Sequence, residues 1–218
     1  MNICKEGMRL YLVTDRTWLK GRQLTDQVEE SLRAGVTLVQ LREKDMPFHE
    51  FLKEAQRIKS LTRQYQVPFI INDNVEIAIA SEADGVHLGQ EDGDIVQARE
   101  RLGVHKIIGI SVHNVEEALT AQKNGADYIG VGAVFPTNTK KDANSLSLEM
   151  LKAICDAVTI PVVAIGGITK DNIMSLKGSG VDGVAVISAI LAKQDIAVAA
   201  KEMFELSGLM SNSTLTKL

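Results

Sequence analysis

Short apolar runs recur along the whole chain and are separated by longer amphipathic segments. Near-continuous apolar runs of about four to eight residues are typical of parallel strands that are covered on both faces. We therefore predict eight strands, within residues 9–15, 38–44, 68–73, 84–89, 107–113, 128–135, 161–167 and 183–190.

Helical patterns fill most of the gaps between these strands, for example residues 24–35, 48–65 and 114–127. Gly35 and Gly125 stand where glycines that end helices are expected. Pro68 and Pro161 open strands, where a missing N–H group is tolerated. The result is a regular alternation of strand and helix.

Alternating strands and helices predict βαβ units and a parallel sheet. Eight such units predict an α/β fold, a single-domain (βα)8 TIM barrel over residues 1–218, with a core at about 9–206 and a polar tail at about 208–218. A Rossmann fold is disfavoured, because the first strand is not followed by Gly-x-Gly-x-x-Gly.

Composition and charge exclude several classes of partner. The chain is 45% hydrophobic but 4% aromatic, so its core must be aliphatic. The net charge is −4 without a basic run, which argues against nucleic acid and against a membrane surface. Cys4 and Cys155 lack metal-binding spacing. With no spanning segment and no signal-peptide pattern, we expect a cytoplasmic protein, and a homo-oligomer stays open.

Function in TIM barrels lies at the carboxyl ends of the strands. Here those ends carry charged, amide, hydroxyl and glycine residues, namely Asp15, Gln40, Arg42, Lys44, Asn72, Asp73, residues 90–92, Ser111, His113, residues 136–141, Gly166, Gly167 and Ser188. They contrast with the aliphatic bodies of the same strands.

The second strand combines a polar and an apolar face. Because side chains alternate along a strand, Gln40, Arg42 and Lys44 share one face, opposite Val39 and Leu41. The apolar face must meet the helices, so the basic pair points into the barrel mouth. Arg42 and Lys44 either reach water and pair with acids, or bind a phosphate or pyrophosphate, which we favour.

Asp73 and Asp92 follow neighbouring strands. Each precedes a helical pattern, so each is a candidate helix cap. Together, beside a basic pair, they are candidate ligands for Mg²⁺, which takes one or two carboxylates and completes its shell with water and phosphate oxygens. Asn72 then remains to bind an organic substrate.

The last two strands predict a second anion site. Gly166 and Gly167 let the backbone approach a phosphate, and Ser188 adds a hydroxyl near a short helix start. The loop at 135–145 is either inert surface or a lid that supplies Thr137, Thr139 and Lys140.

No general base is evident. His87 and His113 have no carboxylate partner at a clear spacing, so we interpret both as structural. Two anion sites, one of them metal-assisted, suit the departure of pyrophosphate while a second phosphate site holds an acceptor.

Seven segments together resemble the thiamine-phosphate synthase family: "QLREK", "INDN", "GVHLGQED", "GISVH", "FPTNTKKDA", "AIGGI" and "VAVISAI". They run in order from about Arg9 to Ile190. The resemblance implies that 4-amino-2-methyl-5-hydroxymethylpyrimidine diphosphate is joined to 4-methyl-5-(2-hydroxyethyl)thiazole phosphate, with release of pyrophosphate. It also implies that the C–O bond breaks first and that the thiazole nitrogen captures a pyrimidine cation.

The resemblance also implies site residues. The metal ligands for Mg²⁺ would be Asp73 and Asp92, and the catalytic residues would be Arg42, Lys44, Ser111 and Lys140. The pyrimidine diphosphate would contact Gln40, Leu41, Arg42, Glu43, Lys44, Asn72, Ser111 and Lys140. The thiazole phosphate would contact Thr137, Asn138, Thr139, Gly167, Ile187 and Ser188.

Two positions depart from the family pattern, Ala133 in place of proline and Asn74 in place of an acid in some members. Three alternatives stay open: a thiazole tautomerase, a non-catalytic phosphate-binding barrel, and another phosphate-handling barrel enzyme. The tautomerase branch is not expected to keep the full set of Asn72, Asp73, Asp92 and Lys140. The third class would normally show an evident acid–base pair.

Overall fold

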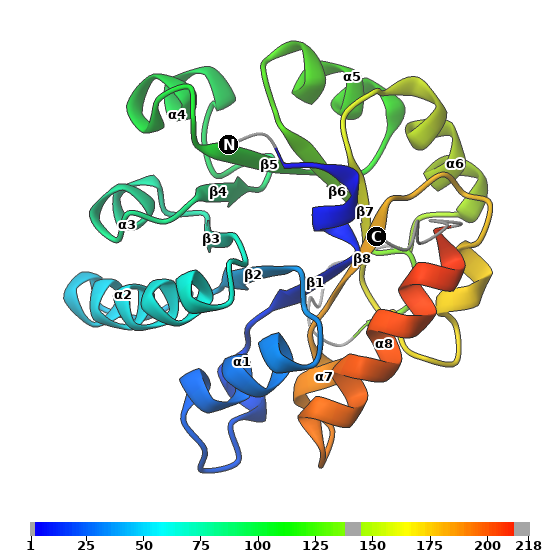
Figure 1. Cartoon of the computed structure of the whole chain (residues 1–218). Coiled ribbons are helices and arrows are strands. Elements are labelled where there is room, and N and C mark those ends of the chain that lie inside the picture. Colours follow the sequence, from blue (N-terminus) through cyan, green and yellow to red (C-terminus); the bar gives the residue numbers. More distant parts are fainter. Residues whose placement is uncertain (1–2, 138–144, 212–218) are drawn as a thin grey trace.

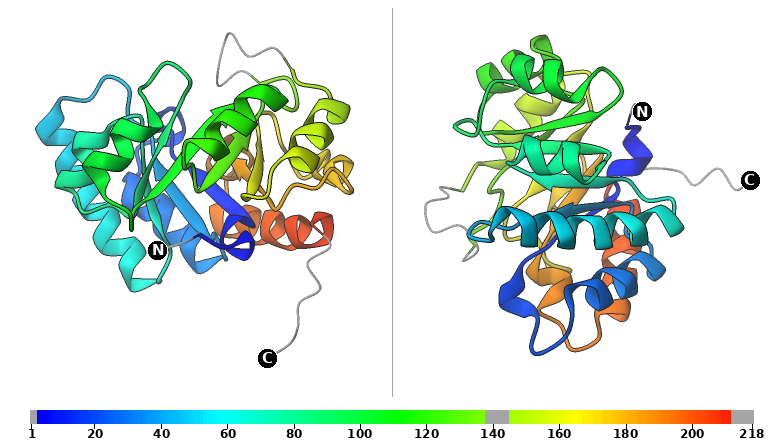
Figure 2. Two further views of the ribbon diagram at one scale, coloured as in Figure 1. Left: turned by 90° about the horizontal axis from the view of Figure 1, so that it is seen from above. Right: turned by 90° about the vertical axis from the view of Figure 1, so that its left-hand side faces the viewer.

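The computed structural model describes residues 3–137 and 145–211. Eight parallel strands close into a barrel in sequence order, and β8 pairs with β1. Figure 1 shows the helices arranged outside these strands, and Figure 2 shows the same arrangement from two further sides. The predicted TIM barrel is therefore confirmed.

The strands are β1 (Leu10–Val13), β2 (Leu38–Leu41), β3 (Phe69–Asn72), β4 (Gly85–Leu88), β5 (Ile107–Val112), β6 (Tyr128–Val131), β7 (Val162–Ile165) and β8 (Gly183–Val186). The α-helices are α1 (Leu24–Arg33), α2 (Phe48–Gln64), α3 (Val75–Ala80), α4 (Ile95–Leu102), α5 (Val115–Lys123), α6 (Leu148–Ala157), α7 (Ser188–Leu191) and α8 (Ile196–Met210). Three short 3₁₀ helices are η1 (Lys5–Met8), η2 (Arg16–Trp18) and η3 (Ile173–Leu176). No helix within the described ranges has the length and apolarity needed to cross a membrane.

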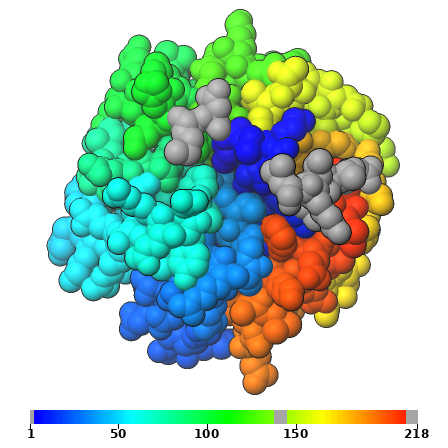
Figure 3. Space-filling view, in the orientation of Figure 1, coloured from blue at the N-terminus to red at the C-terminus, as the bar shows by residue number. Residues whose placement is uncertain are grey.

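Several predicted boundaries were wrong. The run at 183–190 is not one strand, because β8 ends at Val186 and α7 begins at Ser188. The polar tail does not start at 208, since α8 continues to Met210, whose side chain is buried. The folded part also begins before residue 9, with η1 and the fully buried Met8. Figure 3 shows this N-terminal segment (blue) in the middle of one face, beside α8 (red).

The core has two layers that follow from the alternation of side chains along each strand. Between the sheet and the helices lie residues such as Leu12, Val39 and Ile71. Inside the barrel lies a smaller cluster of Met8, Tyr11, Val13, Leu38, Ile70, Ile107, Tyr128, Val163 and Ala185. Two of the chain's three tyrosines thus occupy the barrel interior.

Glycines on the inward face make room for these large side chains. A Cβ atom added to Gly109 on β5 would lie 2.0 Å from Cζ of Tyr128. A Cβ atom added to Gly130 on β6 would lie 3.2 Å from Cε1 of His87. Tyr128 is therefore seated in a space that only glycine at position 109 leaves open.

We predict that Gly109→Ala destabilises the protein by about 1–3 kcal/mol, because the Tyr128 ring must move in a closely packed interior. The control is Gly7→Ala, where the added Cβ makes only an ordinary contact, 3.4 Å to Cγ1 of Ile3. Urea unfolding of both variants measures the difference. Equal stability of Gly109→Ala and the parent protein would contradict this packing argument.

Candidate active site

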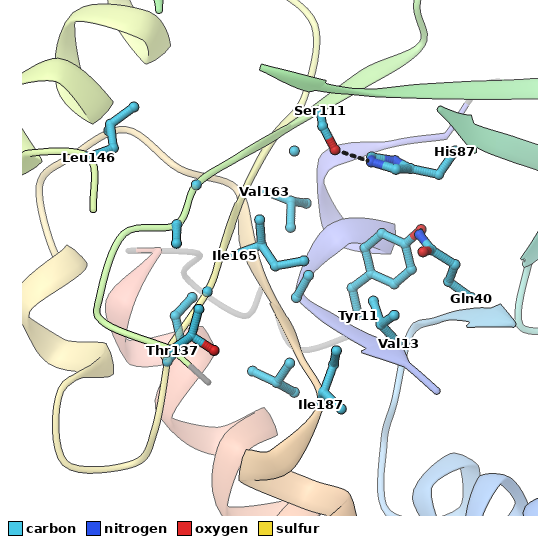
Figure 4. A pocket seen from close by; sticks show the side chains of 18 of the residues that line it. Tyr11, Val13, Gln40, His87, Ser111, Thr137, Leu146, Val163, Ile165 and Ile187 are labelled. Atoms are coloured by element: carbon cyan, nitrogen blue, oxygen red, sulfur yellow. Dashed lines mark hydrogen bonds between the residues drawn. The ribbon is translucent and has the colours of Figure 1, made fainter. Parts of the chain in front are cut away.

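A cavity of about 990 Å³ opens at the carboxyl end of the barrel. This volume is at the upper end of the range for small-molecule sites, so it can hold two small substrates side by side. Its lining includes Tyr11, Gln40, Arg42, Lys44, Asn72, His87, Ser111, Gly130, Thr137, Gly166, Gly167, Ile187 and Ser188. Figure 4 shows residues of the lining converging from several strands.

Strand β2 delivers its polar face to this cavity as predicted. Gln40, Arg42 and Lys44 line it. Arg42 is held by a 3.0 Å hydrogen bond from its backbone N–H to Oγ1 of Thr14, and its Nη1 lies 3.9 Å from Oδ2 of Asp15. The guanidinium is thus oriented at the cavity wall, where it can meet an anion.

The two intervening residues behave differently. The Leu41 side chain is fully buried between the sheet and the helices, so only its backbone can reach a ligand. Glu43 accepts a 2.8 Å hydrogen bond from Nε of Arg16. Burial raises the pKa of Glu43, and Arg16 partly opposes this shift. Glu43 is therefore engaged by an arginine at the edge of the site.

A buried chain of hydrogen bonds crosses the barrel interior beneath the cavity. Nε2 of Gln40 donates to the Tyr11 hydroxyl at 2.5 Å, and the Tyr11 and Tyr128 hydroxyls are 2.8 Å apart. The Tyr128 hydroxyl lies 2.9 Å from Nδ1 of His87, whose Nε2 lies 2.9 Å from Oγ of Ser111. Figure 4 shows the bond between His87 and Ser111 and the Tyr11 ring beside Gln40.

Sequence reasoning missed Tyr11 and Tyr128 as site residues. Two observations could have identified them. Both tyrosines occupy inward-facing positions of their strands, and aromatic residues are rare in this chain, at 4%. His87, interpreted as structural, is indeed held by hydrogen bonds, yet it also lines the cavity.

A second cavity of about 460 Å³ adjoins the first, and Lys44 and Asn72 line both. The second cavity contains Asp73 and Asp92. The structure thus brings the two predicted metal ligands together beside the predicted basic residue. Lys44 and Asn72 therefore stand where the two cavities come closest.

Neither acid caps a helix in the structure. The cap of α3 is Asn74, which accepts a 2.9 Å hydrogen bond from the N–H of Ile77. The cap of α4 is Asp94, which accepts from two N–H groups. Asp73 has a left-handed φ of 61°, and Asp92 accepts from the N–H of Gly89 at 2.9 Å. The helix-cap alternative is therefore wrong for both acids.

Two carboxylates at this position repel each other. Burial and the neighbouring Asp92 raise the pKa of Asp73 from 3.8 to about 6, while Lys44 and Asn72 partly offset this shift. The amide of Asn72 donates a short hydrogen bond to Oδ2 of Asp73. The pair is a site with excess negative charge that a cation would relieve.

The donor set fits Mg²⁺. Among the described residues there is no group of three or more His, Cys, Asp and Glu side chains able to hold a metal ion, so an all-protein cage is not present in this part of the chain. Mg²⁺ does not need one, because it commonly takes one or two carboxylates and keeps waters and substrate phosphates. Asp73 and Asp92 are the residues that would hold it.

The described residues of the predicted phosphate cradle also meet in the large cavity. Gly166 and Gly167 have left-handed φ values of 97° and 63°. A Cβ atom on Gly167 would lie 2.4 Å from the carbonyl oxygen of Pro136, so the turn requires glycine. Ile187, Ser188 and Thr137 line the same cavity. The predicted residues Asn138, Thr139 and Lys140 lie outside the described residues.

The structure supports the interpretation of His113 as structural, but one premise behind it was wrong. His113 does have a carboxylate partner, because its Nδ1 lies 3.1 Å from Oε2 of Glu117, four residues further on. The same carboxylate accepts from the backbone N–H of His113 at 2.8 Å. His113 therefore helps to hold the start of α5 at the cavity wall.

We predict that Asp73→Asn stabilises the metal-free protein near pH 7.5. A carboxyl whose pKa is raised from 3.8 to about 6 on folding contributes stability that is complete below pH 4 and lost as pH rises through 6. Asparagine is neutral and tolerates the left-handed backbone. In EDTA, the melting temperature of the variant should exceed that of the parent at pH 7.5 and match it at pH 4. A pH-independent difference would contradict the repulsion.

Comparison with known proteins gives a consistent result. The family model described as thiamine monophosphate synthase matches residues 10–190. A thiamine-phosphate synthase of Clostridium acetobutylicum is 52% identical over 206 residues, covering 94% of this chain and 97% of that protein. One from Clostridium tetani is 53% identical over 194 residues, covering 89% and 93%.

A solved structure agrees with these relatives. Thiamine phosphate pyrophosphorylase from Pyrococcus furiosus superimposes with a TM-score of 0.87 at 43% identity, covering 94% of this chain and 98% of that chain. The family model, the sequence relatives and the shared barrel lead to one conclusion: the chain belongs to the thiamine monophosphate synthase family of transferases.

Proposed function

We propose that the chain is a Mg²⁺-dependent thiamine-phosphate synthase that joins 4-amino-2-methyl-5-hydroxymethylpyrimidine diphosphate to 4-methyl-5-(2-hydroxyethyl)thiazole phosphate. The observation that carries the proposal is the pair Asp73 and Asp92 beside Lys44, where a second cavity meets the large one. The names of the relatives and their coverage of nearly the whole chain support the same reaction.

The diphosphate would lie across the junction of the two cavities. Arg42 and Lys44 would bind its oxygens from β2, and Asn72 would donate to it from β3. Asp73 and Asp92 would hold Mg²⁺. When bound, this ion would supply positive charge that stabilises the leaving pyrophosphate. Lys140, which the resemblance implies as a further contact, would add charge from the loop.

The reaction would begin with the pyrimidine. The bond between its methylene carbon and the diphosphate oxygen breaks, and the electron pair leaves with pyrophosphate. The amino group of the pyrimidine donates electrons into the ring and stabilises the resulting cation. The thiazole nitrogen then attacks the methylene carbon. This sequence needs no protein base, in agreement with the lack of an evident one in the sequence.

The thiazole phosphate would bind at the other side of the large cavity. Gly167, Ile187 and Ser188 would surround its phosphate, and Thr137 would contact it from the loop after β6. Asn138 and Thr139 are proposed for the same contact. Holding both substrates in one cavity makes the second step effectively unimolecular, which is a large part of the proposed rate enhancement.

We predict that Asp92→Asn lowers Mg²⁺-dependent coupling by at least about a hundredfold, because an oriented metal is worth several kcal/mol in the transition state. The matched control is Asp94→Asn. It makes the same change in charge two residues away and keeps a good helix cap, so it should retain activity. Pyrophosphate release and thiamine phosphate formation are followed together. Equal activity of the two variants would remove Asp92 from the metal site.

We predict that Ser188→Ala raises KM for the thiazole phosphate by about tenfold, because one hydrogen bond to a charged phosphate is lost. KM for the pyrimidine diphosphate should stay unchanged and serves as the internal control. Steady-state kinetics with each substrate varied in turn measure both values. A rise confined to the diphosphate would reverse the assignment of the two anion sites.

The alternatives make different predictions in the same assay. A thiazole tautomerase would release no pyrophosphate from the pyrimidine substrate. A non-catalytic phosphate-binding barrel would bind both phosphates without turnover. The carboxylate pair favours the synthase over both, since a phosphate cradle alone requires no acidic residues.

A further inference from the structure

The hydrogen-bonded chain from Gln40 to Ser111 links two residues at the cavity through three side chains inside the barrel. It crosses five strands, β2, β1, β6, β4 and β5, and the residues at its two ends lie 71 positions apart in the sequence (111 − 40). Tyr11 is 2% exposed and Tyr128 is fully buried. In such surroundings a polar group is retained only when its hydrogen bonds are satisfied.

Each member of the chain constrains the next. Burial raises the pKa of both Tyr11 and Tyr128 well above the ordinary value, so both phenols keep their single proton. Nε2 of Gln40 donates to Tyr11, and the arrangement in which each phenol both accepts and donates has Tyr11 donating to Tyr128 and Tyr128 donating to Nδ1 of His87. A neutral imidazole that accepts at Nδ1 carries its proton on Nε2 and donates to Oγ of Ser111.

This direction determines what the ends present to the cavity. Gln40 uses its amide N–H and therefore offers its carbonyl oxygen, an acceptor. Ser111 accepts from His87 and therefore offers its O–H, a donor. In this arrangement an acceptor at Gln40 is accompanied by a donor at Ser111.

We propose that Tyr11, Tyr128 and His87 are positioning residues that set this acceptor–donor pair for the amino-substituted pyrimidine ring. An exocyclic amino group donates to the Gln40 carbonyl, and a ring nitrogen accepts from the Ser111 hydroxyl. The inference rests on the proposed function, which places the pyrimidine at Gln40 and Ser111. It adds that three residues inside the barrel determine how that ring is held, while the diphosphate is held separately.

The surrounding glycines support a dedicated arrangement. Gly109 leaves the space for the Tyr128 ring, and Gly130 leaves the space next to His87. The Tyr11 and Tyr128 rings meet edge to face, with centroids 6.0 Å apart, and the His87 and Tyr128 rings lie 5.5 Å apart. The Tyr11, Tyr128 and His87 rings are therefore held by packing as well as by hydrogen bonds, as a positioning role requires.

The test removes single hydroxyl groups. We expect Tyr128→Phe and Tyr11→Phe each to raise KM for the pyrimidine diphosphate by about tenfold or more, with KM for the thiazole phosphate unchanged. The matched control is Tyr65→Phe, which loses hydroxyl contacts to Arg33 and Glu29 on the outside of the barrel and should change neither KM. Thermal melting of each variant confirms that it is folded.

A binding measurement distinguishes a loss of ring recognition from a general structural defect of the variant. Calorimetry with inorganic pyrophosphate and Mg²⁺ should give the same affinity for Tyr128→Phe and the parent protein, because this probe has no ring. Equal losses for pyrophosphate and both substrates would show a merely structural role and overturn the inference. Unchanged KM values in both folded tyrosine variants would overturn it as well.

A spectroscopic arm does not depend on activity. In ¹⁵N-labelled protein, the His87 signal, assigned with His87→Asn, should show the proton on Nε2. A proton on Nδ1 would contradict the direction of the chain. If the parent protein does not couple the two substrates, the proposed function fails. The His87 tautomer still tests the direction of the hydrogen bonds between Gln40 and Ser111.

Discussion

The site depends on the repulsion between two carboxylates. Asp73 and Asp92 follow the adjacent strands β3 and β4, and the closed barrel brings them into one small cavity. Neither is used as a helix cap, and Lys44 offsets only part of their charge. Such a pair costs stability in the metal-free protein at neutral pH, and a bound cation would relieve that cost.

The remaining residues divide into two chemical environments. At the rim, Arg42, Lys44 and the acids form a charged, partly solvated site suited to a diphosphate and Mg²⁺. Deeper in the barrel, Tyr11 and Tyr128 form a neutral, buried and hydrogen-bonded interior. In the proposed reaction, the first environment would stabilise charge on the leaving group, and the second would position the uncharged ring. One cavity would thus combine both functions.

Much of the rim could be predicted from the sequence, because the period of two along a strand decides which side chains point inward. This rule separated Gln40 and Arg42 from Leu41. The rule does not locate helix starts. Asp73 and Asn74, or Asp92 and Asp94, are similar cap candidates, and only the backbone course selects Asn74 and Asp94.

The hydrogen bonds from Gln40 to Ser111 inside the barrel could not be predicted from the sequence, because they depend on which distant strands face each other across the closed barrel. Tyr11 and Tyr128 are 117 residues apart in sequence. The pairing of His113 with Glu117 was missed for a simpler reason, since its spacing of four residues matters only once α5 is known to start at Val115. The strand ends were overestimated because apolar residues continue beyond the strands, as at residues 187–190, where α7 begins at Ser188.

Calorimetric titration of Mg²⁺ into the protein, in the presence of inorganic pyrophosphate, measures whether Asp73 and Asp92 hold a metal ion. Repeating it at pH 6 in two buffers of different ionisation enthalpy measures proton release. We predict that Mg²⁺ binds the parent protein saturably and releases more protons than it does with Asp73→Asn. The reason is that Mg²⁺ displaces the proton that the Asp73–Asp92 pair partly retains at that pH. The protons that pyrophosphate itself loses to Mg²⁺ are common to the parent protein and Asp73→Asn, so the difference between the two titrations is the quantity compared. Equal proton release in the two proteins, or binding that is unchanged in Asp73→Asn, would contradict the metal site.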